Sequence, residues 1–478
     1  MTQFSKMFDV AVVGAGPTGM LCTKVLAEAG LSVALICERE KGPNRHNYFN
    51  YSPNIQYDHY NGFGGGTHLW ANVCRPHDLS DYKNFSDAIL YPGNQAYLQA
   101  EKFLGVENGS IFWHSATQPK FHGNWIEKFS DKVEFLAFVY PRKIYKITQS
   151  KLKNITGSKV FLLDGFFAQS IRKCSDTFCV NLLNENNGEL SQIQARRVMI
   201  CAGTVGSASL IERSIIFDEL PIHKLSRNQV GRNIHEHFMF TIGRINFDTK
   251  VLKPKPKAIG NQIVKFAFRL VDYNEINHSI YALPALSGSS IDKSDQLRQI
   301  LINIQNQIKR SPWSLLKLLL YPNLIYQIVD EKILKGGKIE TYDLWTVLQS
   351  NPSDDRKIEF TDDGNPACLH LQFDQNDIQH VTDLQSNLSR YIKDGTFETV
   401  AIDEIIHNAS ISAHLAGSLK QTMRPEDGVV DENFELHGCS GIFVGDASSI
   451  PVSGTSNITL TACANAWTAS KNLISGLN

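Results

Sequence analysis

A glycine-rich turn near the N-terminus constrains the fold of this chain more than any other feature. It lies between two apolar runs of strand length, residues 8–13 and 31–37, and residues 20–29 between them have helical spacing. Two continuous apolar strands joined by a helix predict a parallel sheet that is buried on both faces. The turn has the spacing GxGxxG, formed by Gly14, Gly16 and Gly19.

This turn has the chemistry of a dinucleotide-binding site. Gly14 permits the tight turn, Gly16 lets the backbone approach a pyrophosphate, and Gly19 lets the helix pack closely on the strand. The helix N-terminus adds unpaired N–H groups and a positive dipole, which favour phosphate. The alternative, a glycine turn without a ligand, is disfavoured because strand, turn, helix and second strand follow one another in the expected order.

Glu38 follows the second apolar run and extends the same site. A carboxylate there accepts hydrogen bonds from both ribose hydroxyls and repels a 2′-phosphate, which disfavours NADP. The fingerprint does not by itself separate FAD from NAD. From this unit we predict the cofactor-binding residues Gly14, Gly16, Pro17, Thr18, Gly19, Glu38 and Arg39.

Composition excludes several classes of partner. The chain has 478 residues, of which 42% are hydrophobic and 20% charged, and its formal net charge is −1. This length predicts two or three domains, and the balanced charge argues against attraction to nucleic acid or to an anionic membrane. The nine cysteines include no CxxC pair, so they give no metal-ligand pattern and no disulfide framework, and they suit a reducing compartment.

No targeting or membrane segment is recognisable. The first seven residues are mixed and polar, unlike a signal peptide. The most apolar later stretch, residues 311–329, is interrupted by Pro312, Lys317 and Pro322, so we expect no transmembrane segment. This stretch is either a buried helix or an apolar lid over an active site. We expect a cytoplasmic protein.

The remaining patterns divide the chain further. Residues 41–100 are expected to be rich in loops, and residues 131–200 alternate like antiparallel strands, with a hairpin turn at residues 184–188. Residues 240–400 combine strand patterns with a helical stretch from about 294 to 334. They are typical of a second, mixed domain inserted into the first. A buried strand and a helix close the chain.

The glycine turn is the first of five motifs that occur in order along the sequence. The second is Gly64–Asn72, and the third joins Ala202–Ser207 with Val230–His237. The fourth, a weaker one, runs from Gln349 to Pro366, and the fifth runs from His414 to Thr461. Together they resemble the glucose–methanol–choline (GMC) family of FAD-dependent oxidoreductases.

The resemblance implies a fold class and a division of the chain. It predicts an α/β protein with a Rossmann-like FAD-binding domain and an inserted α+β substrate-binding domain. The FAD-binding domain would comprise residues 1–240, with a flavin loop at 62–76, and would return at residues 401–478 with the catalytic residues. Residues 241–400 would form the substrate-binding domain and carry the helical insert.

The resemblance also implies FAD as the cofactor. Consecutive glycines in the second motif would let a flat ring lie on bare backbone. His68 lies one position before the histidine to which some family members attach the flavin, so we predict non-covalent FAD. The resemblance adds these cofactor-binding residues: Gly65, Gly66, His68, Leu69, Asn72, Ala168, Ala202, Gly203, Asp446, Ala447, Asn457, Ile458 and Thr459.

Two residues are predicted to carry the chemistry. His414 matches the family's catalytic histidine, and a neutral imidazole is available as a base at cytoplasmic pH. Asn457 matches the second active-site position, where an amide cannot titrate and would orient the alcohol. His235 and His237 lie close together, but without a recognisable third ligand we predict no metal and a structural role. Weaker candidates for substrate contact are Trp70 and Gln349.

The expected reaction is oxidation of an alcohol (CH–OH) by base-assisted hydride transfer to flavin N5. The substrate would be a sugar or a small or secondary-metabolite alcohol, and the electron acceptor O2 or another acceptor. Two alternatives stay open. One is a flavin-containing lyase of the same family with no net redox change, and the other is a non-catalytic flavoprotein subunit.

Overall fold

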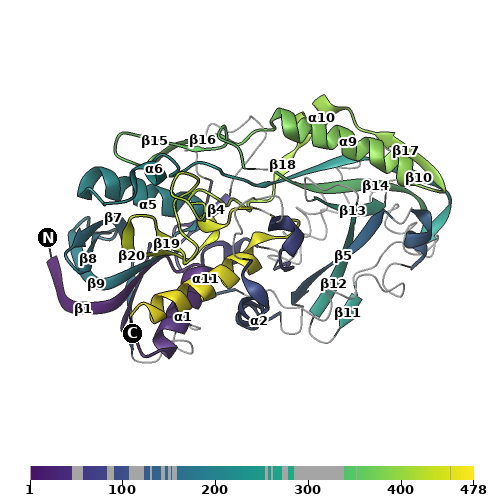
Figure 1. Cartoon of the computed structure of the whole chain (residues 1–478). Helices are drawn as coiled ribbons and strands as arrows, with labels where there is room; N and C mark the ends of the chain where they lie inside the picture. The colour runs from purple at the N-terminus through teal and green to yellow at the C-terminus, as the bar shows by residue number, and fades with distance from the viewer. Residues whose placement is uncertain are drawn as a thin grey trace.

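Two large sheets organise the chain in a computed structural model (Figure 1). The structure describes residues 2–45, 58–70, 72–82, 91–106, 123–129, 132–141, 146–148, 152, 159–252, 257–259, 262–271, 278–284, 338–350, 352–452 and 454–477. Both chain termini lie at the end of the molecule that holds the first sheet (Figure 1).

The first sheet brings the two ends of the chain together. Its strand order is β19 (Glu435–Leu436), β20 (Cys439–Val444), β9 (Leu190–Ile200), β1 (Thr2–Val13), β2 (Val33–Cys37) and β6 (Val160–Asp164). The pairs β20–β9, β9–β1, β1–β2 and β2–β6 are all parallel. Every residue of β2 is buried. The predicted parallel sheet, buried on both faces, is confirmed.

An antiparallel extension is attached to β9. The strand β8 (Thr177–Asn184) pairs with β9 on one side and with β7 (Phe166–Cys174) on the other. The predicted hairpin turn at residues 184–188 lies between β8 and β9, where Gly188 has a φ of 73°. Glycine adopts this left-handed conformation at little cost, and the turn therefore closes here.

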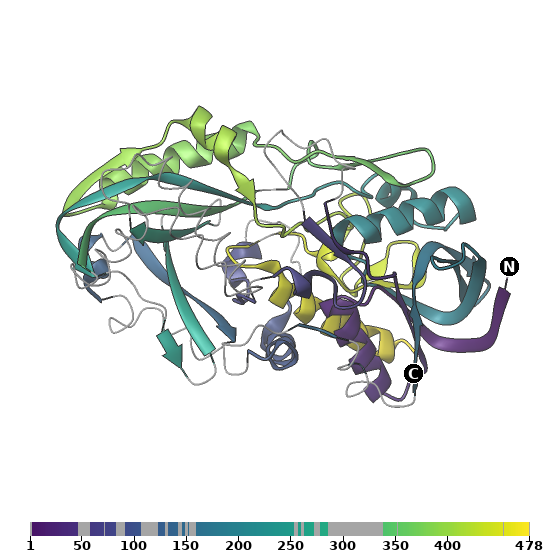
Figure 2. The same ribbon diagram turned by 180° about the vertical axis from the view of Figure 1, so that it is seen from behind.

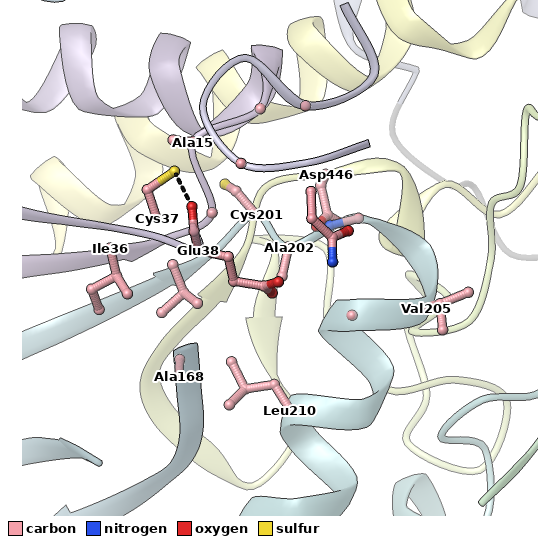
Figure 3. Close-up of a pocket in the computed structure, with 18 of the residues that line it drawn as sticks. Ala15, Ile36, Cys37, Glu38, Ala168, Cys201, Ala202, Val205, Leu210 and Asp446 are labelled. Carbon is pink, nitrogen blue, oxygen red and sulfur yellow. Dashed lines mark hydrogen bonds between the residues drawn. The ribbon is translucent and has the colours of Figure 1, made fainter. Parts of the chain in front are cut away.

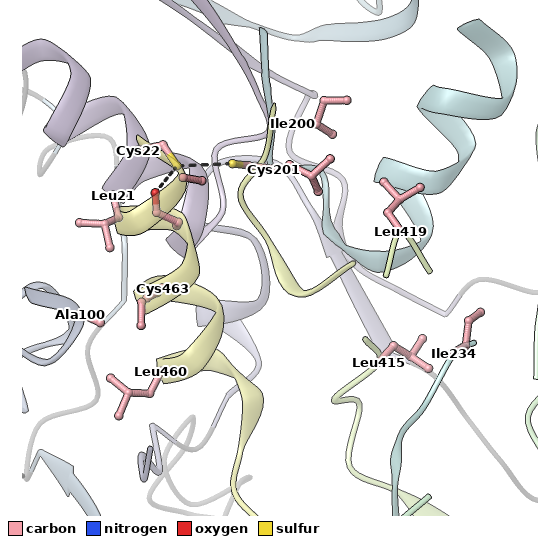
Figure 4. Packing of buried hydrophobic residues seen from close by; sticks show 14 of the residues in the cluster. Leu21, Cys22, Ala100, Ile200, Cys201, Ile234, Leu415, Leu419, Leu460 and Cys463 are labelled. Atoms are coloured by element: carbon pink, nitrogen blue, oxygen red, sulfur yellow. Dashed lines mark hydrogen bonds between the residues drawn. The ribbon is translucent and has the colours of Figure 1, made fainter. Parts of the chain in front are cut away.

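Helices from distant parts of the chain cover this sheet. The helices α1 (Pro17–Glu28) and α11 (Ile458–Ser475) lie side by side, and α2 (Gly93–Leu104) packs against α11 (Figures 1 and 2). The helix α5 (Gly203–Asp218) packs on β7. Figure 4 shows part of the core between the helices, to which Cys22 of α1, Cys463 of α11 and Ala100 of α2 contribute buried side chains.

The helix α2 falls within the residues that the sequence predicted to be rich in loops. Its buried face includes Ala96, Tyr97 and Ala100, which are small or amphipathic side chains and give a weak apolar stripe. The short elements nearby are β3 (Gly42–Arg45), β4 (Asp58–Asn61), η1 (Gly65–His68), η2 (Leu79–Tyr82), η4 (Gly123–Lys128) and, later in the chain, α6 (Lys224–Arg227).

The second sheet is antiparallel and is centred on one long strand, β10 (His237–Leu252). Its order is β11 (Lys257–Ile259), β12 (Gln262–Leu270), β13 (His278–Pro284), β14 (Lys338–Gln349), β10 and β17 (Gly395–Thr399), and β18 (Ser410–Ile411) also pairs with β10. The helices α9 (Gln375–Tyr391) and α10 (Ile402–Asn408) pack on β10. Gln385 of α9 donates to the carbonyls of Ile242 and Val400, at 3.0 and 2.7 Å.

Two segments cross between the expected domains. The strand β5 (Val133–Pro141) lies within residues 1–240 but pairs with β12 of the second sheet. The hairpin of β15 (Ile358–Phe360) and β16 (Pro366–Leu369) lies within residues 241–400, yet β15 contacts α5. Alternating apolar residues satisfy either sheet equally well, so the pattern alone does not assign a strand to one of them. The division at residues 240 and 400 stays a prediction.

The predicted helical stretch at 294–334, with the apolar residues 311–329, lies outside the described residues. Among the helices that the structure does describe, none has both the length and the apolar character needed to cross a membrane.

The aromatic side chain of Trp125 gives a test of the second sheet's core. Trp125 is fully buried, and its ring contacts Phe129, Phe247, Phe268 and Tyr342. We expect Trp125→Ala to lower the free energy of unfolding by about 3–5 kcal/mol, because the cavity cannot collapse among rigid rings. Denaturant unfolding measures this. The control is Phe217→Ala on α5, where the side chain is 59% exposed. An equal effect at both positions would contradict this packing.

Candidate functional site

In the glycine turn between β1 and α1, the backbone packs so closely that two of the glycines have no room for a Cβ atom. Gly14 has a φ of 102°, and a Cβ atom there would lie 2.3 Å from the carbonyl oxygen of Cys201. A Cβ atom at Gly19 would lie 1.9 Å from the carbonyl oxygen of Gly14. The first and third glycines therefore pack the turn against the sheet and the helix, as the sequence predicted.

A cavity of about 690 Å³ opens beside this turn, within the usual range for a ligand site. Figure 3 shows its wall, with Glu38 on one side and Asp446 on the other. The predicted cofactor-binding residues that line it are Gly14, Gly16, Pro17, Thr18, Glu38, Gly65, Gly66, Ala168, Ala202, Gly203, Asp446, Ala447, Ile458 and Thr459. They come from both ends of the chain and from the middle.

Three of these glycines leave room that a side chain would fill. No atom lies within 4 Å of the position of a Cβ at Gly16, Gly66 or Gly203, and all three line the cavity. Gly16 is also the N-cap residue of α1, so the first N–H groups of that helix are close by. Bare backbone beside a helix N-terminus fits the pyrophosphate and the flat ring of a dinucleotide.

Glu38 lies where β2 ends and the cavity begins. Burial raises the pKa of its carboxyl group, and the neighbouring charge of Glu185 adds to this effect. Lys41 and Arg213 act in the opposite direction. Lys41 pairs with Glu185 at 2.6 Å, so the β8–β9 hairpin contributes to this end of the site.

Arg213 is a cavity residue that the sequence did not indicate. It is buried on α5 and donates to the carbonyls of Gln169 and Ala168, at 2.8 and 3.1 Å. Burial lowers the pKa of its guanidinium to about 10. Asn365 and Pro366, from the turn and start of β16, lie at the same end of the cavity. No local motif marks Arg213, because only the packing of α5 against β7 and β15 places it there.

Asp446 is buried and joins the C-terminal segment to the start of α5. Its Oδ2 accepts the Gly203 N–H at 2.8 Å and the Ser207 hydroxyl at 2.6 Å. Its Oδ1 accepts the Ser448 N–H at 2.9 Å, which caps the short helix η8 (Ala447–Ser449). Burial raises the pKa of the carboxyl group, and these hydrogen bonds favour its charged form.

A second cluster of polar side chains surrounds His414. Its Nε2 accepts a hydrogen bond from Asn457 Nδ2 at 3.0 Å, and its Nδ1 lies 3.0 Å from His237 Nδ1 and 2.7 Å from Ser412 Oγ. Burial lowers the pKa of the His414 imidazole well below its usual value, and the charges of His237 and His77 add to this effect. The predicted catalytic residues His414 and Asn457 are therefore in direct contact.

Consecutive residues of the chain join the cluster around His414 to the large cavity. Asn457 contacts His414, and the next two residues, Ile458 and Thr459, line the large cavity at the start of α11. The loop before α11 thus leads from His414 to the dinucleotide cavity.

Several predicted residues do not line that cavity. The His68 ring stacks on Tyr60 at 4.2 Å, and its Nε2 lies 3.0 Å from the carbonyl oxygen of Phe63. Leu69 is 42% exposed, Asn72 is buried with a φ of 61°, and buried Gln349 pairs with His237 across β14 and β10. The others outside the lining are Gly19, Arg39, Trp70, His414 and Asn457.

The pair of histidines near the start of β10 contacts the C-terminal loop. His235 Nε2 lies 3.0 Å from the carbonyl oxygen of Ile450, and His237 Nε2 lies 2.8 Å from that of Gly454. The sequence showed no third ligand beside them, but the structure places Glu236 and His414 next to His237, with ligand atoms within 4.8 Å of one another. The Nδ1 atoms of His237 and His414 hydrogen-bond to each other, and Glu236 Oε1 accepts the backbone N–H groups of both residues. The absence of a bound metal stays a prediction.

Two parts of the chain match models of known protein families. A model described as an FAD binding domain matches residues 7–46, and a model described as GMC oxidoreductase matches residues 373–466. The C-terminal part of the chain is therefore similar to the GMC oxidoreductase family, in agreement with the resemblance seen in the sequence. The protein has FAD as its cofactor and is an FAD-dependent oxidoreductase, as the sequence resemblance implied.

The fold agrees with a solved structure. The pyridoxine 4-oxidase from Mesorbium loti is 14% identical in sequence, and the match covers 98% of this chain and 99% of that chain with a TM-score of 0.56. No curated protein matches the sequence. The expected α/β architecture with a Rossmann-like FAD-binding domain is confirmed.

Two alanine substitutions in the glycine turn separate packing from cofactor binding. We expect Gly16→Ala to fold normally, because its Cβ meets no protein atom within 4 Å, but to bind FAD at least about tenfold more weakly. We expect Gly19→Ala to lower the melting temperature of the apoprotein, because its Cβ would lie 1.9 Å from a carbonyl oxygen. Flavin titration and thermal unfolding measure the two effects. Equal loss of stability in both variants would contradict this division.

Proposed function

We propose that this chain oxidises a small-molecule alcohol, with His414 as the base and Asn457 as the residue that orients the hydroxyl group. One observation carries the proposal: the 3.0 Å contact between His414 Nε2 and Asn457 Nδ2, directly beside the FAD-cavity residues Ile458 and Thr459. Bound FAD would supply the hydride acceptor.

The protonation state of His414 follows from its hydrogen bonds. The Gly454 carbonyl only accepts, so His237 must donate to it from Nε2, at 2.8 Å. In neutral His237 the Nδ1 then carries a lone pair, and His414 must donate to it from its own Nδ1, at 3.0 Å. The lone pair of His414 is therefore on Nε2, the atom that faces Asn457.

A neutral His414 with its lone pair on Nε2 has the properties of a general base. Burial keeps its pKa low, so the imidazole stays unprotonated at neutral pH. An alcohol that enters between His414 and Asn457 would donate its hydroxyl proton to Nε2. The amide of Asn457 would donate to the hydroxyl oxygen and so fix the position of the carbon that loses hydride.

The substrate class that we propose is a sugar or a small or secondary-metabolite alcohol. The structural neighbour is named as an oxidase of pyridoxine, and pyridoxine therefore belongs in a first screen. The electron acceptor would be O2 or another acceptor.

Flavin reduction tests the role of His414. We expect a member of an alcohol and sugar panel to bleach the flavin anaerobically, and His414→Ala to slow this by about 100-fold or more, the usual contribution of a general base. His407→Ala, on the exposed side of α10, is the matched control. Turnover without bleaching would indicate a lyase instead, and full activity of His414→Ala would contradict a catalytic role for this residue.

The mode of flavin attachment is tested separately. We expect acid precipitation to release the yellow colour into the supernatant, because the flavin would be held without a covalent bond. The ring of His68 supports this, since it stacks on Tyr60 and lies outside the cavity lining. Absorbance of the pellet and supernatant measures the outcome. A pellet that stays yellow after washing would contradict non-covalent binding.

A further inference from the structure

Glu236 is a buried carboxylate that the proposed reaction does not yet use. Its Oε1 accepts three hydrogen bonds: from the N–H groups of His237 and His414, each at 2.8 Å, and from the hydroxyl of Ser412 at 2.9 Å. Its Oε2 has no hydrogen-bond partner among the described residues. Glu236 is fully buried, and the loss of solvation makes a charged carboxylate unfavourable here unless hydrogen bonds or a nearby positive charge compensate for it.

Backbone pairing brings Glu236 to this place. His235 and Ala416 exchange two backbone hydrogen bonds of 3.1 Å, and Phe238 pairs with Ile411 of β18. The segment before β10 therefore runs antiparallel to residues 410–416. Ser350 fixes the backbone of Glu236 from the other side, through bonds of 2.8 and 2.9 Å to its N–H and carbonyl groups.

The hydroxyl of Ser412 links the carboxylate to the base. Because Ser412 donates its proton to Glu236, its oxygen lone pairs are directed to other donors, and His414 Nδ1 lies 2.7 Å away. The Nδ1–H of His414 is therefore shared between Ser412 and His237. If Ser412 had no acceptor for its own proton, it could instead donate to Nδ1, and this would leave the proton of His414 on Nε2.

We propose that Glu236 and Ser412 are positioning residues that hold His414 with its proton on Nδ1 and stabilise the imidazolium formed during the reaction. This role rests on the proposed function of His414. In that step the alcohol O–H bond breaks and an N–H bond forms at Nε2. The Nδ1 proton stays on His414, and the negative charge stays on Glu236, one hydroxyl group away.

The arrangement resembles the logic of a Ser–His–Asp triad, in which a buried carboxylate orients an imidazole and stabilises its cation. Here a serine hydroxyl separates the carboxylate from the ring.

The positioning role of Glu236 predicts an effect of pH on the rate, since only an ionised Glu236 provides the negative charge. Burial raises the pKa of Glu236 to about 7. The titratable groups facing this cluster are His237, the residue that follows Glu236 and begins β10, His414 on the segment after β18, and His77, whose charge acts on His414.

The test measures anaerobic flavin reduction by a saturating alcohol in holoenzyme variants. We expect Glu236→Gln to reduce the rate constant roughly 10- to 100-fold, the effect of removing a charge close to a base. The wild-type rate should fall as the pH falls through about 7, where Glu236 gains a proton, and this limb should be missing in Glu236→Gln. Ser412→Ala should slow reduction as well, and Ser412→Thr, which keeps the hydroxyl, should restore most of the rate.

A structural control and a second readout separate this role from simple destabilisation. Ser350→Ala removes contacts to the Glu236 backbone but leaves its carboxylate, so it should lower the melting temperature without changing the pH profile. Histidine labelled with 15N reports the tautomer of His414 by NMR. The proton should lie on Nδ1 in the wild type, and should shift toward Nε2 in Glu236→Leu, where Ser412 has lost the acceptor for its own proton and donates to Nδ1 instead.

Two results would overturn the proposal. In the first, Glu236→Gln keeps the pH profile of the wild type and Ser412→Ala keeps its rate, while His414→Ala is inactive. His414 would then act as the base without help from Glu236 and Ser412. The other is a wild-type tautomer of His414 in Glu236→Leu. The NMR result stands even if no alcohol reduces the flavin, so failure of the proposed function remains distinguishable from failure of the positioning role.

Discussion

The buried carboxylate of Asp446 is the contact on which the rest of the site depends. It follows β20 near the C-terminus, and it holds the N–H of Gly203 at the start of α5. A buried carboxylate without such donors would be strongly unfavourable. Its hydrogen bonds therefore fix how the last strand, the helix α5 and the loop after η8 meet beside the glycine turn.

The loop that follows Asp446 connects this contact to the proposed catalytic residues. Gly417 N–H binds the carbonyl of Ala447, and Leu419 N–H binds that of Ser448, so the segment after His414 runs along η8. The same loop continues to Asn457, which contacts His414. The proposed base, its amide partner and the dinucleotide cavity are thus positioned by one stretch of backbone rather than by independent elements.

The second sheet reaches this stretch through β10. Its first residue, His237, contacts both His414 and the Gly454 carbonyl, and the strand then extends into the sheet as far as Leu252. Because a paired strand is stiff, the position of the sheet and the orientation of the imidazole are coupled. The domain expected to bind the substrate is therefore attached directly to the expected base.

The sequence by itself determined the parts that depend on local chemistry. Gly14, Gly16 and Gly19 predicted a dinucleotide turn because only glycine fits such close approaches, and the motif around His414 implied the family and FAD. Only the tertiary structure decided which distant groups share a site. Arg213 lines the cavity, β5 joins the second sheet, and Glu236 faces His414. These placements come from strand pairing and burial between segments far apart in the chain, and such contacts leave no periodic signal in the sequence.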